Sequence, residues 1–111
     1  MTIEATSTSK AVILRVAGRM DAESHKQFEQ ACEPWIQQGA TYLIVDLAAL
    51  DYISSAGLGA IARASKSLQK KNGAVLLCGL KGLVKEVLEI TRLISMFQVF
   101  ESVEEASASI A

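Results

Sequence analysis

Two adjacent serines, Ser54 and Ser55, stand where a side-chain hydroxyl can do chemistry. They follow the apolar run Leu-Ile-Val at 43–45 and a short polar segment, and they precede a helical pattern of apolar residues. This order predicts a hydroxyl at the start of a helix, where backbone N–H groups are unpaired and the helix dipole is positive. A phosphate group is well accommodated at such a position.

Other chemistry has little support in the sequence. Nucleophilic hydrolysis needs a base beside the serine, and the only histidine, His25, falls on the polar side of a predicted helix, as a solvated residue does. Ile53 stands where a nucleophile elbow requires glycine, and no Walker-type loop is present. Asp46 and Asp51 lack a third metal ligand. We therefore expect no catalysis by this chain, and no metal or other cofactor.

Composition narrows the class of protein. The 111 residues carry a formal net charge of −1, and half of them are hydrophobic, which indicates one domain over residues 1–111. The balanced charge does not favour nucleic acid or an anionic membrane surface as partner. No signal peptide is evident, and no apolar stretch approaches the ~18 residues that span a bilayer. Cys32 and Cys78 fall at apolar positions, which predicts buried free thiols in a soluble cytoplasmic protein.

Hydrophobic periodicity predicts alternating strands and helices. Strand patterns cover residues 2–6, 11–17, 42–47, 74–78 and 97–100, and a helical pattern follows each of the last four. Asp21 is the expected N-cap of the first helix, and Pro34 is expected to kink or restart that helix. Ser102 and Glu105 form a capping box for the last helix.

This alternation predicts an α/β fold with a mixed, mostly parallel sheet of four or five strands and about four helices. Ligand and partner sites in such sheets lie beyond the carboxyl ends of the strands. We expect a loop from Ala48 to Ala56 at that edge, which places the two serines at a potential site.

The residues around the serines also have purely structural interpretations. A serine at a helix start commonly caps the helix. Gly57 and Gly59 permit close approach by a partner backbone, but they equally suit packing of the helix against the sheet. Leu58 is either a partner contact or the first core residue of the helix, and Asp21 is either a contact or only a cap.

The segment from Asp46 to Gly59 resembles the signature of the STAS family, the domain shared by sulphate transporters and anti-sigma factor antagonists. The resemblance rests on Ser54-Ser55-Ala56-Gly57-Leu58-Gly59 after a strand, and on Gly18-Arg19-Met20-Asp21 before the first helix. The order of elements agrees from about residue 2 to residue 110. The resemblance implies a single STAS domain that acts as a stand-alone bacterial anti-sigma factor antagonist.

This resemblance implies a switch. The serine before the small residue and glycine, here Ser55, is phosphorylated by a serine kinase that is also the anti-sigma factor. The unphosphorylated form binds this kinase and releases its sigma factor or another target, and a serine phosphatase resets the switch. Many members have Asp at the position of Ser54, whereas this chain has a second hydroxyl there, and Ser54 is therefore the second candidate for the phosphate. A monomer suits such partner exchange. The implied partner surface comprises Asp21, Ser54, Ser55, Ala56, Gly57, Leu58 and Gly59.

Two alternatives remain open at this point. In the first alternative, the chain is a STAS subunit of a larger assembly, such as a lipid ABC transporter, and is not phosphorylated. In the second, it is a weak nucleotide-binding module that uses the backbone near Gly57. The presence of phosphate on Ser55 in cells separates the switch from the first alternative, and titration with a nucleotide tests the second.

Overall fold

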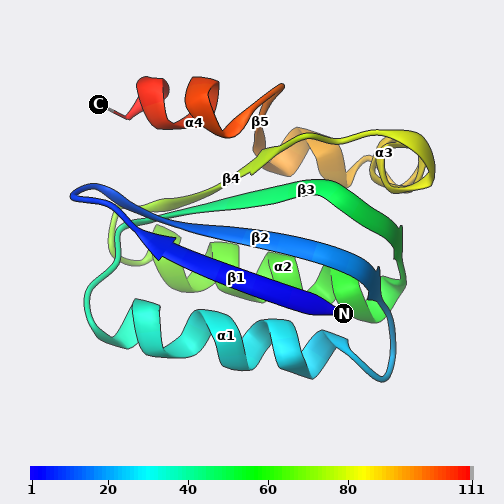
Figure 1. Cartoon of the computed structure of the whole chain (residues 1–111), viewed down its shortest axis with the longest axis horizontal. Coiled ribbons are helices and arrows are strands. Elements are labelled where there is room, and N and C mark those ends of the chain that lie inside the picture. The colour runs from blue at the N-terminus through cyan, green and yellow to red at the C-terminus, as the bar shows by residue number, and fades with distance from the viewer. Residues whose placement is uncertain (111) are drawn as a thin grey trace.

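The apolar segments of the chain form a five-stranded sheet in a computed structural model that describes residues 1–110 (Figure 1). The spatial order of the strands equals their order in the chain, with β1 antiparallel to β2 and the other neighbours parallel. The predicted mixed, mostly parallel sheet is therefore confirmed. The strands are β1 (Thr2–Ser7), β2 (Ala11–Met20), β3 (Tyr42–Ile53), β4 (Ala74–Cys78) and β5 (Gln98–Phe100).

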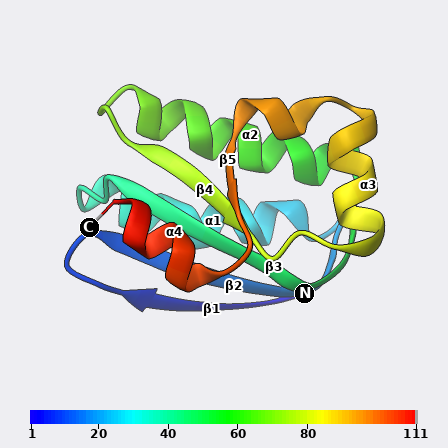
Figure 2. The same cartoon turned by 90° about the horizontal axis from the view of Figure 1, so that it is seen from above.

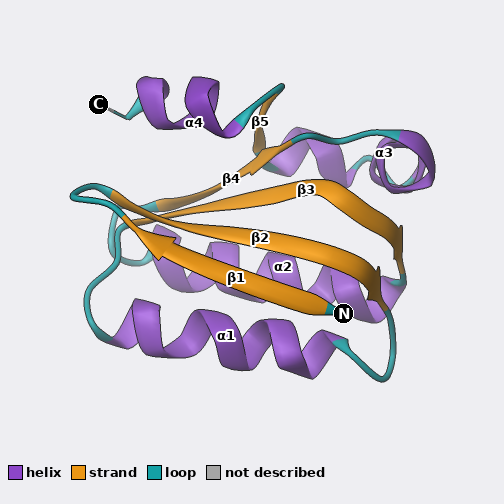
Figure 3. Ribbon diagram, viewed as in Figure 1, coloured by secondary structure: helices purple, strands orange, loops and turns teal. Residues whose placement is uncertain are grey.

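Helices cover both faces of this sheet. They are α1 (His25–Gln37), α2 (Ser55–Gln69), α3 (Gly82–Ile90) and α4 (Val103–Ser109), with a short 3-10 helix, η1 (Leu93–Met96), after α3. Helices α1 and α2 lie side by side on one face, and α4 lies on the opposite face (Figures 1 and 3). The view from above shows α4 over the strands and α3 at one end of the sheet (Figure 2). No helix within residues 1–110 is long and apolar enough to cross a bilayer.

Two apolar layers hold these elements together. Successive residues of a strand point to opposite faces, so Leu43 and Val45 of β3 join the layer beneath α1, α2 and α3, whereas Ile44 joins the layer beneath α4. Phe28 of α1 is fully buried in the first layer and Ala106 of α4 in the second. A strand covered on both faces reads as a continuous apolar run, which explains the sequence at 43–45.

Strands β2 and β3 are longer than predicted. Strand β2 ends at Met20 rather than residue 17, and β3 ends at Ile53 rather than residue 47, because these two extensions pair with each other. Register shifts after Arg15 and Gly18 interrupt the regular alternation along the pair, so the pattern in the sequence does not continue. The predicted loop over 48–56 is therefore wrong, and Ser54 alone separates β3 from α2.

The predicted cap of the last helix, at Ser102, is confirmed. The Ser102 Oγ accepts a hydrogen bond from the Glu105 N–H at 3.1 Å, as a capping box requires. The return bond runs from the Glu101 N–H to the Glu105 carboxylate at 3.2 Å, one residue earlier than the standard motif. Helix α1 continues through Pro34, so the alternative that the helix restarts there is wrong.

Both cysteines are free and buried, as predicted. Burial raises the pKa of the Cys32 thiol to about 12 and that of the Cys78 thiol to about 12. A thiol with such a pKa stays protonated at neutral pH and is a poor nucleophile. The two cysteines therefore act as small apolar core residues.

Candidate functional site

Ser54 forms the joint between β3 and α2. Its backbone is extended, with φ −94° and ψ 174°, and its Oγ accepts a hydrogen bond from the Gly57 N–H at 3.2 Å. Its own N–H donates to the Met20 carbonyl at the end of β2, at 2.8 Å. Ser54 is therefore the N-cap of α2, and its hydroxyl is already engaged.

Ser55 occupies the first position of α2 and is exposed. Among residues 1–110 no side-chain hydrogen bond engages its hydroxyl, in contrast to that of Ser54. The first turn of this 15-residue helix contains no acidic side chain, so the positive end of the helix dipole is not offset there. Of the two serines, Ser55 thus has the hydroxyl that a modifying enzyme can reach.

The residues after Ser55 divide into buried and surface positions. Gly57 is buried, and a Cβ placed there would lie 2.8 Å from Ile53 Cγ1 and 2.9 Å from the Met20 carbonyl oxygen. Leu58 is only 6% exposed and belongs to the core. Packing therefore explains both residues, and neither presents a side chain to the solvent. Ala56 and Gly59 are half-buried and border the exposed Ser55.

Asp21 caps a turn before α1 rather than the helix itself, which corrects the predicted N-cap. Its Oδ1 accepts hydrogen bonds from the N–H groups of Glu23 and Ser24, at 3.0 and 3.1 Å, and Ser24 occupies the N-cap position of α1. These hydrogen bonds, with that from the Ser24 N–H the strongest cause, hold the pKa of Asp21 below its ordinary value. The prediction failed because a carboxylate can satisfy N–H groups two and three residues ahead in a turn as well as in a helix.

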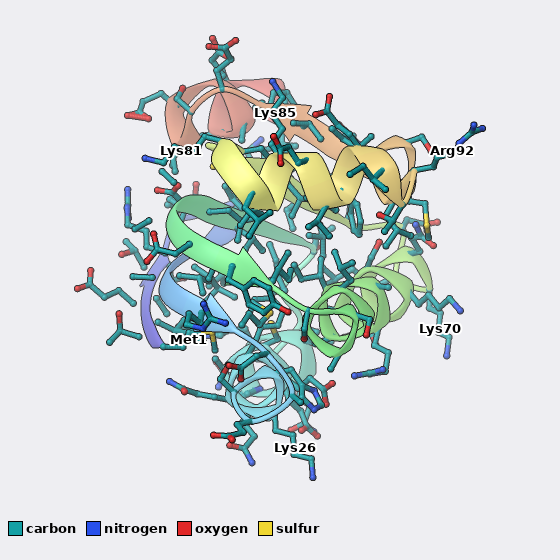
Figure 4. All side chains as sticks on the ribbon, turned by 90° about the vertical axis from the view of Figure 1, so that its right-hand side faces the viewer. Met1, Lys26, Lys70, Lys81, Lys85 and Arg92 are labelled. Atoms are coloured by element: carbon teal, nitrogen blue, oxygen red, sulfur yellow. The ribbon has the colours of Figure 1, made fainter. Side chains whose placement is uncertain are left out.

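The end of β2 brings Asp21 to the same end of the molecule as the serines. Met20 binds Ser54 through its backbone, and Asp21 follows immediately. Figure 4 looks onto this end, with α3 crossing above and α1 below; Lys81 and Lys85 mark α3, and Lys26 marks α1. The sheet thus places Asp21, Ser54 and Ser55 together, although 33 positions separate Asp21 from Ser54 in the chain.

A charged cluster joins α1 to α2 beside this end. The Arg63 Nε donates a hydrogen bond to the Glu29 carboxylate at 3.1 Å, and the His25 Nδ1 lies 3.6 Å from the same carboxylate oxygen. The hydrogen bond from Arg63 holds the pKa of Glu29 below its ordinary value. The His25 side chain is only 18% exposed, so the expected solvated histidine is wrong.

Two contacts at the site were not predicted from the sequence. Arg63 and Glu29 are 34 positions apart, so no local pattern in the sequence indicates their contact. The contact of His25 with Glu29 could have been found, because these residues stand at the i,i+4 spacing of a helical pair. At the end of β2, the Arg19 guanidinium lies 4.3 Å above the ring of Tyr52 in β3. That contact depends on the register of the extended strands.

Comparison with known families matches residues 2–106 to the STAS domain. The chain belongs to the STAS family. A relative from Bordetella bronchiseptica, the candidate anti-sigma factor antagonist BtrV, is 36% identical over 98 residues, which are 88% of this STAS chain and 84% of BtrV. The anti-sigma-B factor antagonist of Staphylococcus aureus is 27% identical over 94% of this chain and 96% of its own.

Solved STAS structures share the fold. A candidate anti-sigma factor antagonist from Thermotoga maritima aligns with a TM-score of 0.91 at 21% identity, over 97% of this chain and 93% of its own. Unphosphorylated SpoIIAA, an anti-sigma factor antagonist, aligns with a TM-score of 0.77 at 19% identity, over 97% of this chain and 96% of its own. At these identities the likeness concerns the fold, and it confirms the predicted STAS architecture.

Removing each hydroxyl in turn tests whether Ser54, and not Ser55, caps α2. Ser54→Ala is expected to lower the free energy of unfolding by about 1 kcal/mol, because the Gly57 N–H loses its cap. Ser55→Ala is expected to change it by less than about 0.5 kcal/mol, since that hydroxyl is exposed and unengaged. Urea unfolding of both variants measures the difference. Equal losses would show that Ser54 is not the effective cap.

Proposed function

We propose that this STAS domain, spanning residues 1–111, is a phosphorylation-switchable anti-sigma factor antagonist of the bacterial cytoplasm, without enzymatic activity of its own. The unphosphorylated chain binds a serine kinase that is also the anti-sigma factor, and this binding releases the kinase's target. Phosphorylation of Ser55 abolishes the binding. The observation that carries the proposal is the exposed, unengaged Ser55 hydroxyl at the start of α2. The names of the relatives from Bordetella and Staphylococcus support it.

The switch involves two reactions. The kinase transfers the γ-phosphoryl group of ATP to the Ser55 oxygen, which loses its proton, and ADP leaves. A serine phosphatase then hydrolyses the new P–O bond with water, which returns the hydroxyl and releases inorganic phosphate. Neither step requires a catalytic group from the STAS chain, because its part is to present the hydroxyl.

The position of Ser55 makes the modification local. Phosphate adds about −1.5 to −2 charges at pH 7 and three acceptor oxygens. At the positive end of α2 this charge is tolerated, so the fold is retained. At a partner surface shaped for a neutral hydroxyl, the same group brings bulk, a desolvation cost and repulsion from acidic side chains. The switch therefore acts at the interface rather than by refolding.

The proposed partner surface has a front and a support. Ser55, Ala56, Gly59 and the turn at Asp21 are at least partly exposed and form the front. The remaining positions predicted for partner binding are the cap Ser54 and the buried pair Gly57 and Leu58, which hold the front in place from behind.

Tandem mass spectrometry of the protein isolated from its native cells, with and without stress, tests this proposal. We expect phosphate on Ser55, with a stoichiometry that changes between the two conditions. Phosphate on Ser54 instead would contradict the assignment of Ser55. Absence of phosphate on either serine under every condition would overturn the switch and favour a non-phosphorylated subunit of a larger assembly.

A further inference from the structure

Arg63 reaches back along α2 toward Ser55. Ser55, Gly59 and Arg63 succeed one another at intervals of four residues, so they follow the same side of the helix. The Arg63 Nη1 lies 3.3 Å from the position that a Cβ would take at Gly59, which places the guanidinium about one helical turn closer to Ser55 than its own backbone is. Because Gly59 has no side chain, nothing from this position separates the guanidinium from the first turn of α2.

The present partner of Arg63 is a single carboxylate on α1. Glu29 accepts hydrogen bonds from the Arg63 Nε, at 3.1 Å, and from the Arg63 Nη2, and the Arg63 side chain is 59% exposed. An exposed pair of this kind contributes little to stability and exchanges readily. A phosphate has more charge than a carboxylate and three acceptor oxygens that match the planar guanidinium. A phosphate on Ser55 is therefore a strong competitor for the same guanidinium.

We propose that phosphorylation of Ser55 draws Arg63 away from Glu29 and onto the phosphate, which opens the ion pair between α1 and α2. This inference rests on the proposed function, since it requires a phosphate on Ser55. Glu29 then keeps His25 as its neighbour, with the Nδ1 at 3.6 Å. The phosphorylated state thus differs from the unphosphorylated one in the charge pattern of two adjacent helices as well as at Ser55 itself.

The second pKa of the phosphate reports on this exchange. A nearby guanidinium favours the dianion and lowers that pKa from its ordinary value of about 6. The experiment uses the full chain with phosphoserine incorporated at position 55 during synthesis, and follows the ³¹P chemical shift against pH. Arg63→Gln is expected to raise the phosphate pKa by about half a pH unit, the size expected for one exposed ion pair. Glu29→Gln is expected to lower it, because Arg63 then has no competing carboxylate.

Lys66→Gln is the matched control. It also removes one positive charge from α2, but its backbone lies about 16 Å from Ser55 along the helix, about 4 Å farther than that of Arg63. Screening over a length of about 8 Å at physiological salt weakens its effect on the phosphate. Arg63→Lys is expected to retain part of the effect. The other charged groups at this end of the molecule, including Arg19, Asp21 and Asp51, are the same in every variant and cancel in the comparison.

Equal phosphate pKa values in Arg63→Gln and Lys66→Gln would overturn the exchange, as would an unchanged value in Glu29→Gln. These outcomes do not depend on whether the proposed function is correct. Because the phosphoserine is installed during synthesis, the titration reads out whether or not native cells phosphorylate Ser55. Failure of the switch shows instead as missing phosphate in cells or as unchanged partner binding. Far-UV circular dichroism of each variant confirms that the chain is folded.

Discussion

Ser55→Asp is expected to weaken binding to the proposed partner, a serine kinase that is also the anti-sigma factor, by about 100-fold, which corresponds to about 3 kcal/mol. The aspartate puts a negative charge on the exposed front of the proposed surface, where the partner meets a neutral hydroxyl in the unphosphorylated chain. The stability of the fold should not fall, because a carboxylate at the first position of α2 interacts favourably with the helix dipole. Isothermal titration of the purified kinase with each form of the chain measures the affinity.

Two controls make this result specific. Ser55→Ala removes the hydroxyl without adding charge and is expected to bind within about threefold of the wild type, since a single exposed hydroxyl contributes little. Far-UV circular dichroism should be nearly the same for all three chains. The interface mechanism fails if Ser55→Asp binds as tightly as the wild type, and a loss of helical signal in that variant would indicate refolding instead.

Gly57→Ala is expected to lower the free energy of unfolding by about 2–3 kcal/mol, the cost of overpacking a tightly filled site. The added methyl group would meet the Met20 carbonyl oxygen at 2.9 Å and the Ile53 side chain at 2.8 Å. Both contacts lie at the ends of the paired extensions of β2 and β3, so the helix start cannot move away without disturbing the sheet. Urea unfolding measures the loss.

Gly59→Ala is the matched control, two residues farther along the same helix. Its added methyl group would meet only the flexible end of Arg63, at 3.3 Å, so the variant should be at least as stable as the wild type. Alanine in place of glycine inside a helix contributes up to about 1 kcal/mol of stability. Similar losses in both variants would mean that the junction of α2 with the sheet is not tightly packed.

The core of this fold follows from local sequence signals. The apolar run at 43–45 and the segment Ala74–Cys78 predict central strands because residues buried on both faces are apolar at consecutive positions. The helical spacing of five residues predicts helix α3, and two of them, Val84 and Leu88, are fully buried. The five residues are Leu83, Val84, Val87, Leu88 and Thr91. In these elements local preference and tertiary burial agree.

The ends of β2 and β3 could not be predicted because their stability comes from their mutual pairing. Asp46 resembles a residue that starts a loop, and its carboxylate does accept a hydrogen bond from the Ala48 N–H, at 3.0 Å. Leu50 and Ile53 are nevertheless buried, because the strand continues beside β2 after a shift of register. The pairing that stabilises these strand ends joins two segments about 30 residues apart, so neither segment alone indicates a strand.

The candidate site was predictable in outline for a different reason. A serine before a glycine-containing helix start suggests either a cap or a modification site, and the sequence has two such serines side by side. The geometry assigns the cap to Ser54, through the hydrogen bond to Gly57, and leaves Ser55 unengaged. Which serine caps depends on the residue at which the helix begins, and that boundary is set by the extended β3.

The single-residue joint at Ser54 also determines what kind of enzyme can act on Ser55. Many protein kinases read a short extended peptide laid along a groove, but here the residues before Ser55 are locked in a strand and those after it are wound into a helix. Under the proposed switch, the kinase must therefore recognise a folded surface, and a synthetic peptide covering this segment would be a poor substrate. Modification of Ser55 is then limited to molecules that have completed folding, so unfolded copies of the chain do not enter the switch.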